Sequence, residues 1–209
     1  TSWKKNNLGK NWVLGETLIT GIGQGYIQTT PLQLCLMTAQ IGNGGYSIKP
    51  KILVDNDPLT FEQAKKALKE KSLNNSEIQL FENPKNIKIV QEAMFSSTNE
   101  IYGTSYRSRI DDPKYQFAGK TGTAQVKRIS KRERELDLKI DQIPYNDRDH
   151  ALYVAYGPYK NPRYALSIIV EHGGSGSKAA APMAKKLFKL IIDRDELREK
   201  QPNFEEINI

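Results

Sequence analysis

Apolar residues form one nearly continuous run early in the chain, from Leu32 to Ile41. Thr30 followed by Pro31 is a typical N-cap and first-turn pair, and Asn43-Gly44-Gly45 ends the run. These features predict a mostly buried helix that begins at Pro31 and ends close to Asn43.

Three later segments have the amphipathic spacing of a helix. Thr60–Lys71 carries its apolar residues on one side and predicts a surface helix. A second helix is predicted to open at Asn83-Pro84 and to carry apolar residues as far as Phe95. The third is Ala179–Asp193, in which Pro182 is tolerated because it falls in the first turn.

Strands are predicted where β-branched, aromatic or small residues lie between turn residues. The predicted strands are Ile48–Val54, Phe117–Val126, Ala151–Tyr156 and Tyr164–Glu171. The last two are joined by Gly157-Pro158 and Asn161-Pro162, and so short a connection favours antiparallel pairing. Helices and strands together predict an α+β fold in which an antiparallel sheet is flanked by helices.

Two segments lack apolar periodicity. Lys127–Asp149 holds seven Lys or Arg and six Asp or Glu in 23 residues, which exceeds the usual hairpin connection. We predict a mobile loop there, between two adjacent strands. Residues 194–209 are polar, so we predict one domain, or a large part of one, over 1–193 and a loosely held tail over 194–209.

The charge balance of the 209-residue chain is basic, with 31 Lys and Arg against 24 Asp and Glu and a net charge of +7. Such a balance can indicate a nucleic acid, an anionic membrane or a polyanionic polymer as partner. The excess charge is spread thinly and no nucleic-acid-reading motif accompanies it, so we predict no nucleic-acid partner.

Metal, disulfide and membrane sites have little support in the sequence. One cysteine, Cys35, and two histidines, His150 and His172, cannot form a disulfide framework or a closed Cys/His zinc site. No apolar run approaches the roughly 18 residues of a membrane-spanning helix. We therefore expect no metal, and we expect any membrane anchor to lie outside this chain.

Two glycine-rich segments resemble nucleotide-binding loops and fail on spacing. Gly21–Gly25 has the pattern G-x-G-x-G, and no hydrophobic strand precedes it. Gly119-Lys120-Thr121 resembles the end of a phosphate-binding loop, but the required glycine five positions earlier is replaced by Lys114. No cofactor is therefore predicted.

The remaining candidate is Lys120-Thr121-Gly122, which alone is a weak match and could simply be an edge strand protected from aggregation by a lysine. Its weight comes from an ordered series of motifs around it. The series is Gly15-Glu16-Thr17, Ile22–Tyr26, Thr30–Leu34, Ala118–Gln125, Asp149-His150-Ala151 and Glu171–Gly174. From about Trp3 to Ile192 it resembles the transpeptidase domain of class B penicillin-binding proteins, and within them the elongation type (penicillin-binding protein 2-like).

The resemblance implies the penicillin-binding transpeptidase or serine β-lactamase-like fold, here incomplete at its N-terminal side, with no cofactor. The implied activity is that of a peptidoglycan D,D-transpeptidase, a serine acyl-enzyme that cross-links stem peptides and is a target of β-lactams. It would act in cell-wall elongation at the periplasmic face of the inner membrane. A membrane-embedded glycan polymerase and the elongation complex would be its partners, through regions outside this chain. The alternative is a catalytically inactive or sensory penicillin-recognising module on the same fold.

The resemblance also implies roles for individual residues, with Lys120, Thr121 and Gly122 as the catalytic ones. Lys120 would supply positive potential and a hydrogen bond to the family's second motif, S-x-N or S-x-D. Thr121 and Thr123 would offer hydroxyls to the terminal carboxylate of the substrate, and the Thr123 amide would be half of the oxyanion hole. Gly122 would leave room for a substrate that adds along the strand. His172 is a further candidate at the border of the cleft.

The family's nucleophile motif, S-x-x-K, has two matches here, at Ser2 and Ser175, and S-x-N has two, at Ser72 and Ser97. All four are rejected, because the family places both motifs upstream of the Gly-Gln-Gly-Tyr region, with the nucleophile on a buried central helix. Ser2 is nearly terminal, and the other three serines lie downstream of that region. We therefore expect the nucleophilic serine and the general-base lysine to lie outside this chain, and the chain alone to be inactive.

Two expectations concern packing. Without the helix that bears the nucleophile, the apolar side chains of Leu32, Leu36, Val154 and Ile168 are expected to be uncovered. Tyr26, in the Gly-Gln-Gly-Tyr region, is expected to be a core aromatic residue.

Overall fold

The computed structural model describes residues 2–50, 78–127 and 138–200. The chain divides into two compact units, Thr1–Thr30 and Pro31–Ile209. The predicted helix Thr60–Lys71, the larger part of the predicted strand Ile48–Val54 and the middle of the predicted loop lie outside the described residues.

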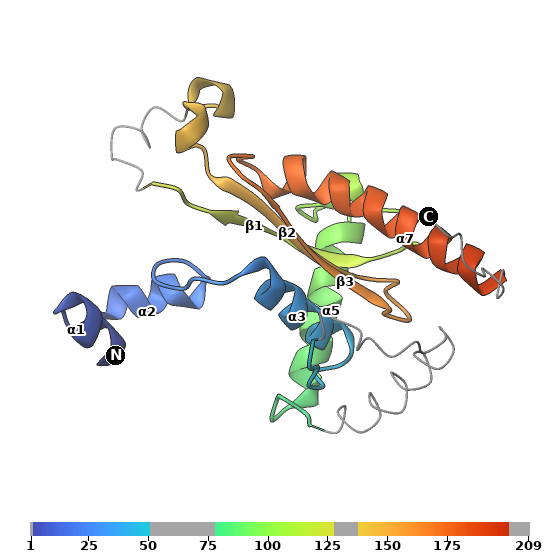
Figure 1. Ribbon diagram of the computed structural model, residues 1–209, viewed down its shortest axis with the longest axis horizontal. Helices are drawn as coiled ribbons and strands as arrows, with labels where there is room; N and C mark the ends of the chain where they lie inside the picture. The colour runs from blue at the N-terminus through green and yellow to red at the C-terminus, as the bar shows by residue number, and fades with distance from the viewer. Residues whose placement is uncertain (1, 51–77, 128–137, 201–209) are drawn as a thin grey trace, which may run out of the picture. The chain divides into compact units, whose positions relative to one another are not determined.

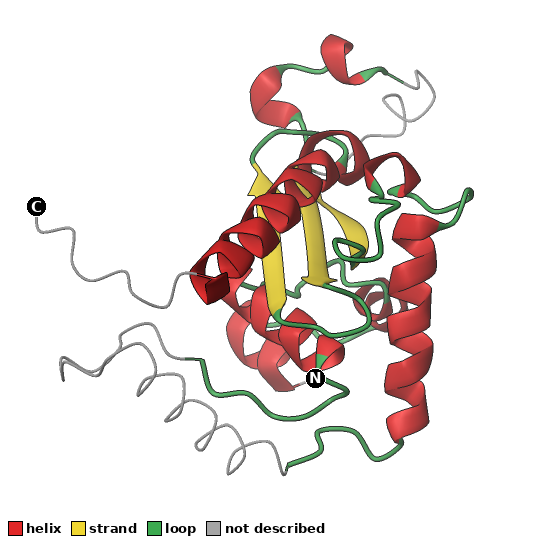
Figure 2. Cartoon of the chain, turned by 90° about the vertical axis from the view of Figure 1, so that its right-hand side faces the viewer, coloured by secondary structure: helices red, strands yellow, loops and turns green. Residues whose placement is uncertain are grey.

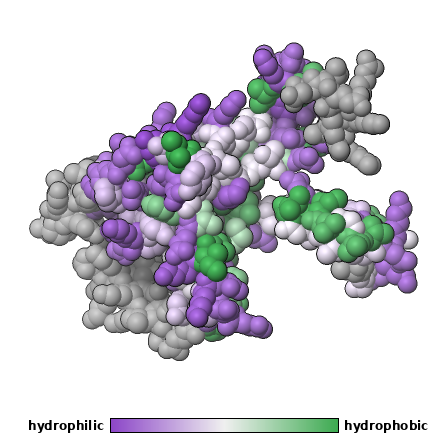
Figure 3. All heavy atoms as spheres, turned by 180° about the vertical axis from the view of Figure 1, so that it is seen from behind, coloured by the Kyte–Doolittle hydropathy of each residue, from purple (hydrophilic) through white to green (hydrophobic). Residues whose placement is uncertain are grey.

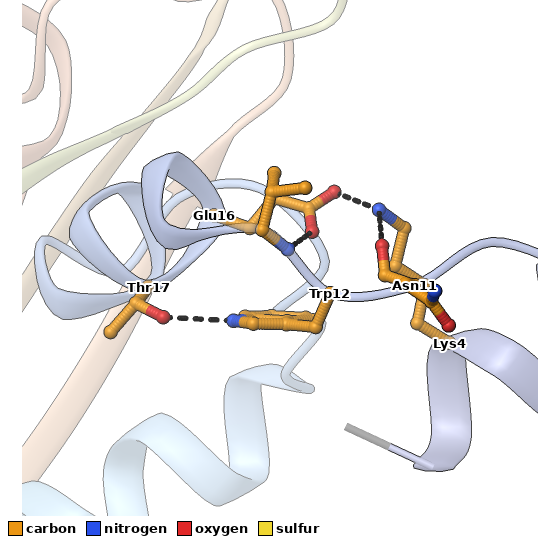
Figure 4. A network of polar contacts seen from close by, with 6 residues as sticks. Lys4, Asn11, Trp12, Glu16 and Thr17 are labelled. Atoms are coloured by element: carbon orange, nitrogen blue, oxygen red, sulfur yellow. Dashed lines mark hydrogen bonds and ion pairs between the residues drawn. The ribbon is translucent and has the colours of Figure 1, made fainter.

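The first unit contains the helices α1 (Ser2–Leu8) and α2 (Leu14–Gly21), which are joined by a partly buried ion pair between Lys4 and Glu16. Figure 4 shows the Lys4 ammonium between the Asn11 carbonyl oxygen, 2.9 Å away, and the Glu16 carboxylate. Lys4 is only 5% exposed. The other carboxylate oxygen of Glu16 accepts the Val13 amide at 2.9 Å, which caps the first turn of α2.

Aromatic contacts add to this unit. The Trp12 indole donates to the Thr17 hydroxyl at 2.8 Å, and the Tyr26 ring lies 5.7 Å from Trp3 and 6.2 Å from Trp12. Tyr26 is nevertheless 44% exposed, so the prediction of a core aromatic residue is wrong, because Tyr26 packs between two partly exposed indoles.

The second unit is built on an antiparallel sheet of three strands, β1 (Ala118–Ala124), β2 (His150–Gly157) and β3 (Tyr164–Val170). The strand order is β1-β2-β3, so β1 lies at an edge (Figure 1). Lys120 pairs with Val154 and Ala151 pairs with Val170. The α+β fold with an antiparallel sheet is confirmed.

Three long helices flank this sheet: α3 (Pro31–Gly42), α5 (Pro84–Asn99) and α7 (Ala181–Lys200). The Asn83 side chain accepts the Lys85 amide at 3.0 Å, which confirms the predicted start of α5. Helix α7 runs seven residues beyond the predicted end at Asp193, because the strong helix formers of its last turns continue the pattern.

Short helical turns fill the connections. They are the 3-10 turns η1 (Tyr106–Ser108), η2 (Ile140–Gln142) and η3 (Tyr145–Asp147) and the π-helical turn η4 (Gly176–Ala180). The described part of the predicted loop is Lys127 and residues 138–149. In residues 138–149, η2 and η3 give the chain local structure. The described part of Ile48–Val54, residues 48–50, is not a strand; Tyr46 instead forms a single bridge with Gln79.

The strand alternation divides the core between the two faces of the sheet. On one face, Phe117 and Tyr153 pack with Phe188 of α7, which Figure 2 shows lying across the strands. On the other face, Ala118 and Tyr156 pack with Met94 of α5. Successive residues of β1 therefore alternate between the side of α7 and the side of α3 and α5.

Burial of the apolar faces differs in part from expectation. In α3 only Thr38 and Gly42 are buried, so the helix is less buried than predicted, and Leu32 is 50% exposed. The side chains of Leu36, Val154 and Ile168 are half-buried, because Val154 and Ile168 pack against the two core clusters.

Apolar side chains are also exposed on the first unit, as Figure 3 shows by their green colour. Leu14, Leu18 and Ile22 are 77%, 68% and 77% exposed. Leu14 and Leu18 are four residues apart and therefore lie on one side of α2, and Ile22 is the residue that caps its C-terminal end.

Candidate active site

The side chains of Lys120 and Thr121 lie together on the edge strand β1. Lys120 is exposed, and its ammonium donates to the Thr121 carbonyl oxygen at 2.8 Å and approaches the Thr121 hydroxyl at 3.4 Å. Within the described part of the chain, β1 pairs with β2 alone. A positive charge and a hydroxyl are thus presented at the rim of the sheet.

The Thr121 hydroxyl is the last of three hydroxyl groups that lie in a row. Its Oγ1 lies 3.2 Å from Thr104 Oγ1, which in turn lies 3.2 Å from Ser97 Oγ. Ser97 is in the last turn of α5, and Thr104 is in the turn that follows this helix. The loop after α5 therefore contacts β1 at the residue next to Lys120.

A second polar network is buried beneath the strand. The Tyr153 hydroxyl lies 2.9 Å from the Thr98 hydroxyl and 3.1 Å from the Ser105 hydroxyl. Thr98 also donates to the Gly119 carbonyl oxygen at 3.4 Å. Burial raises the pKa of Tyr153, partly opposed by its hydrogen bonds with Ser105 and Thr98. The network ties the end of α5 to the first residues of β1.

The glycines of β1 have different surroundings. A Cβ on Gly119 would lie 2.4 Å from the Tyr153 hydroxyl oxygen, so no side chain fits there. A Cβ on Gly122 would meet only the Leu152 Cβ, at 3.4 Å, an ordinary contact. Gly176 of η4 approaches the same strand closely, because its Cβ would lie 2.8 Å from the Gly122 carbonyl oxygen. Space is therefore open where a Gly122 side chain would lie, whereas Gly176 of η4 lies close to the Gly122 carbonyl oxygen.

Thr123 is exposed and pairs with Ala151 in the register of β1 and β2. His150, the next residue back along β2, pairs with Ala124. Thr123 follows Lys120, Thr121 and Gly122 directly along the same edge strand.

His172 lies away from these four residues, after the end of β3, which is separated from β1 by β2. Its amide donates to His150 Nδ1 at 2.9 Å, and its own Nδ1 lies 3.0 Å from the Arg148 carbonyl oxygen. The Tyr145 ring lies 4.9 Å from the imidazole. These contacts stabilise the turn after β3. That His172 borders the substrate-binding cleft stays a prediction.

The rejected serines have surroundings that do not suit a nucleophile. Lys5 and Lys178, the lysines of the two S-x-x-K strings, are exposed, whereas a neutral general-base lysine needs a desolvated site. Ser72 lies outside the described residues. Ser97 lies at the end of α5 as expected, yet it reaches the Lys120 strand through Thr104.

A pocket of about 990 Å³ lies where residues 138–149 approach the turn after β3. Ile140, Arg148, Gly174 and Lys178 are among its lining residues. The lining includes no residue of β1, so this pocket is separate from the edge that carries Lys120.

The described residues contain no group of three or more His, Cys, Asp or Glu side chains placed to hold a metal ion. None of the helices in the described ranges is long and apolar enough to cross a membrane.

The arrangement on β1 suits an extended, anionic ligand. An edge strand can pair with an added peptide through main-chain hydrogen bonds. The Lys120 ammonium and the neighbouring threonine hydroxyls offer charge-assisted hydrogen bonds to a carboxylate.

Ser97, Thr104 and Tyr153 were not singled out from the sequence as supports of this strand. Thr104 lies in the turn that follows α5. Its contact with Thr121, 17 residues later, carries no local signal.

Comparison with known proteins agrees with the geometry. Residues 2–189 match the family described as "Penicillin binding protein transpeptidase domain". The peptidoglycan D,D-transpeptidase MrdA of Haemophilus influenzae is 31% identical over 207 residues, which are 99% of this chain and 30% of that protein. MrdA of Acinetobacter baumannii is 34% identical over 188 residues, 89% of this chain and 26% of that protein.

Solved structures give the same result. Penicillin-binding protein 2 of Pseudomonas aeruginosa, in complex with WCK 5153, is 34% identical with a TM-score of 0.65, covering 91% of this chain and 36% of that one. Penicillin-binding protein 2 of Helicobacter pylori, in complex with MreC, is 31% identical with a TM-score of 0.64, covering 90% and 30%.

The chain thus spans between 26% and 36% of the length of these four relatives. The motif on β1, the three-stranded sheet and the match over residues 2–189 lead to one conclusion. This chain belongs to the penicillin-binding protein transpeptidase domain family and is homologous to the D,D-transpeptidase MrdA.

Proposed function

We propose that this chain is the C-terminal part of the transpeptidase domain of a peptidoglycan D,D-transpeptidase that acts in cell elongation. The observation that carries the proposal is the placement of Lys120 and Thr121 side by side on the exposed edge strand β1. The homology to MrdA supports the reaction type.

In this proposal β1 binds the donor stem peptide as an added strand. Main-chain groups of Thr123 pair with the peptide, and Gly122 leaves the approach to the strand open because only Leu152 lies near the position that its Cβ would occupy. The edge position of β1 supports this role, since an interior strand has no main-chain groups to offer.

The terminal carboxylate of the stem peptide is held by hydroxyls and by positive charge. Thr121 and Thr123 donate to the carboxylate, and the exposed Lys120 ammonium supplies a favourable potential. The same groups would bind the carboxylate of a β-lactam. A bidentate set of this kind fixes the scissile carbonyl in one orientation.

Acylation follows at a serine that the rest of the protein supplies. The serine oxygen attacks the D-Ala-D-Ala carbonyl, its proton passes by way of a general-base lysine to the leaving amine, and the terminal D-Ala departs. The Thr123 amide stabilises the oxyanion that forms. The acceptor amine of a second stem peptide then attacks the acyl-enzyme and completes the cross-link.

The proposal includes the setting of the reaction. The full-length protein would be anchored in the inner membrane by a segment outside residues 1–209 and would work on its periplasmic face. Its partners would be a membrane-embedded glycan polymerase and the elongation complex, as the complex of the Helicobacter pylori relative with MreC supports. Residues 1–209 alone would be inactive.

Labelling with a fluorescent penicillin tests the proposal. The full-length protein should be labelled, and residues 1–209 alone should not. Purified full-length protein should also cross-link stem peptides on a polymerised glycan substrate. Labelling without cross-linking would favour the penicillin-recognising sensor, and absence of both would overturn the proposal.

A further inference from the structure

The row of hydroxyls that ends at Thr121 begins in helix α5. Ser97 Oγ, Thr104 Oγ1 and Thr121 Oγ1 follow one another at 3.2 Å each. At the far end the Lys120 ammonium lies 3.4 Å from Thr121 Oγ1. Each of the two neighbouring pairs of hydroxyls is therefore within hydrogen-bond distance.

Counting hydrogens shows what the row can do. Each hydroxyl has one hydrogen to donate and two lone pairs, whereas an ammonium can only donate. Thr121 Oγ1 therefore accepts from Lys120, and its single hydrogen goes either to Thr104 or outward to a ligand. If it goes to Thr104, Thr121 presents only lone pairs and repels a carboxylate.

The opposite direction leaves the hydrogen of Thr121 available. Ser97 then donates to Thr104, and Thr104 donates to Thr121, which also accepts from Lys120. Such a chain polarises its members in the same sense, which strengthens the last donation. A carboxylate at Thr121 selects this direction.

The main chain holds Thr104 in place for this role. The Ser105 amide and hydroxyl both donate to the Ser97 carbonyl oxygen at 3.0 Å. On the other side, a Cβ on Gly103 would lie 2.4 Å from the same carbonyl oxygen, so the turn lies directly on α5. Thr104 is thus fixed between two neighbours that both contact Ser97.

We propose that Thr104 is a positioning residue for substrate binding, which donates its hydroxyl hydrogen to Thr121 so that Thr121 can donate to the carboxylate of the substrate. Ser97 supplies the preceding donation from α5. This inference rests on the proposed function. It means that Ser97 and Thr104, which lie outside β1, contribute to binding of the carboxylate of the ligand.

The test compares a penicillin with its methyl ester on the full-length protein. Thr104→Val keeps the shape of the side chain and removes the hydroxyl. The second-order acylation rate with the free acid should fall about three- to tenfold, while the rate with the ester, which lacks the anionic charge, should change little. Thr104→Ser should restore the rate with the acid, and Ser97→Ala should lower it by a smaller factor.

Tyr102→Phe is the matched control, because Tyr102 lies in the same loop and donates its hydroxyl to Glu100 instead. It should leave both rates unchanged, and thermal melting should show that all variants fold. Wild-type acylation by Thr104→Val, or an equal loss with acid and ester, would overturn the role of Thr104. Failure of the unmodified protein to react with the acid would instead overturn the proposed function, and this inference with it.

Discussion

The phenolic oxygen of Tyr153 lies 2.4 Å from the position that a Cβ on Gly119 would occupy. The Tyr153 ring is fully buried, and its hydroxyl is held by Thr98 and Ser105. The glycine before Lys120 is therefore required by packing, since the tyrosine has no room to move aside.

Gly119→Ala should destabilise the full-length protein by about 1 to 3 kcal/mol, because the added methyl group overpacks a buried site. Gly122→Ala is the matched control on the same strand, where the methyl group meets only an ordinary contact at 3.4 Å. Denaturant unfolding of both variants measures the difference. Equal stabilities would show that Tyr153 yields to the methyl group.

Lys120→Ala should slow acylation of the full-length protein by a β-lactam at least about tenfold, or about 1.4 kcal/mol in the transition state. Folding should be little changed, because the Lys120 side chain is exposed. Stopped-flow acylation and thermal melting provide the two readouts. Lys160→Ala removes another exposed lysine, in the turn between β2 and β3, and should leave the rate unchanged; a wild-type rate in Lys120→Ala would refute the role given to Lys120.

Asn83→Ala should lower the stability of the protein by about 1 kcal/mol, because the first turn of α5 loses its side-chain cap. Asn83→Asp should retain most of the stability, since a carboxylate caps equally well. Unfolding midpoints of the two variants test this. A loss of the same size in both would point to a role of Asn83 other than capping.

The ion pair of the first unit should make stability depend on pH. The hydrogen bond from Lys4, followed by that from the Val13 amide, lowers the pKa of Glu16 below its ordinary value of 4.5. A lowered pKa contributes stability that is present above pH 4.5 and is lost as the pH falls through the folded-state pKa.

Glu16→Gln should therefore be less stable than wild type at neutral pH, and the difference should shrink in acid. Thermal melting between pH 7 and pH 3 checks this. Glu82→Gln, at an exposed position outside the network, should show no such convergence. A difference for Glu16→Gln that stays constant with pH would contradict the assignment.

Local patterns were enough to predict most of the sheet and the ends of several helices. Asn83-Pro84 marks the start of α5 because capping depends only on neighbouring residues. The last two strands and the turn between them were predicted from composition. The observed β2 is one residue longer at each end than predicted, and β3 ends one residue earlier.

Contacts between distant segments could not be predicted in the same way. The fit of Tyr153 against Gly119 and the contact of Thr104 with Thr121 depend on how α5 lies along β1. Tyr26 was predicted to be a core residue but is 44% exposed, because hydrophobicity alone does not say what covers a side chain. Of the candidate site, the motif residues were found from the sequence, whereas their supports were not.

Peptide mapping by mass spectrometry of the full-length protein after reaction with penicillin tests the central claim most directly. We predict a single penicilloyl adduct on a serine outside residues 1–209, and loss of most of this adduct at short reaction times in Lys120→Ala. An adduct on Ser2 or Ser175, or no adduct at all, would contradict the division of roles between the substrate-binding strand described here and a nucleophile supplied by the rest of the protein.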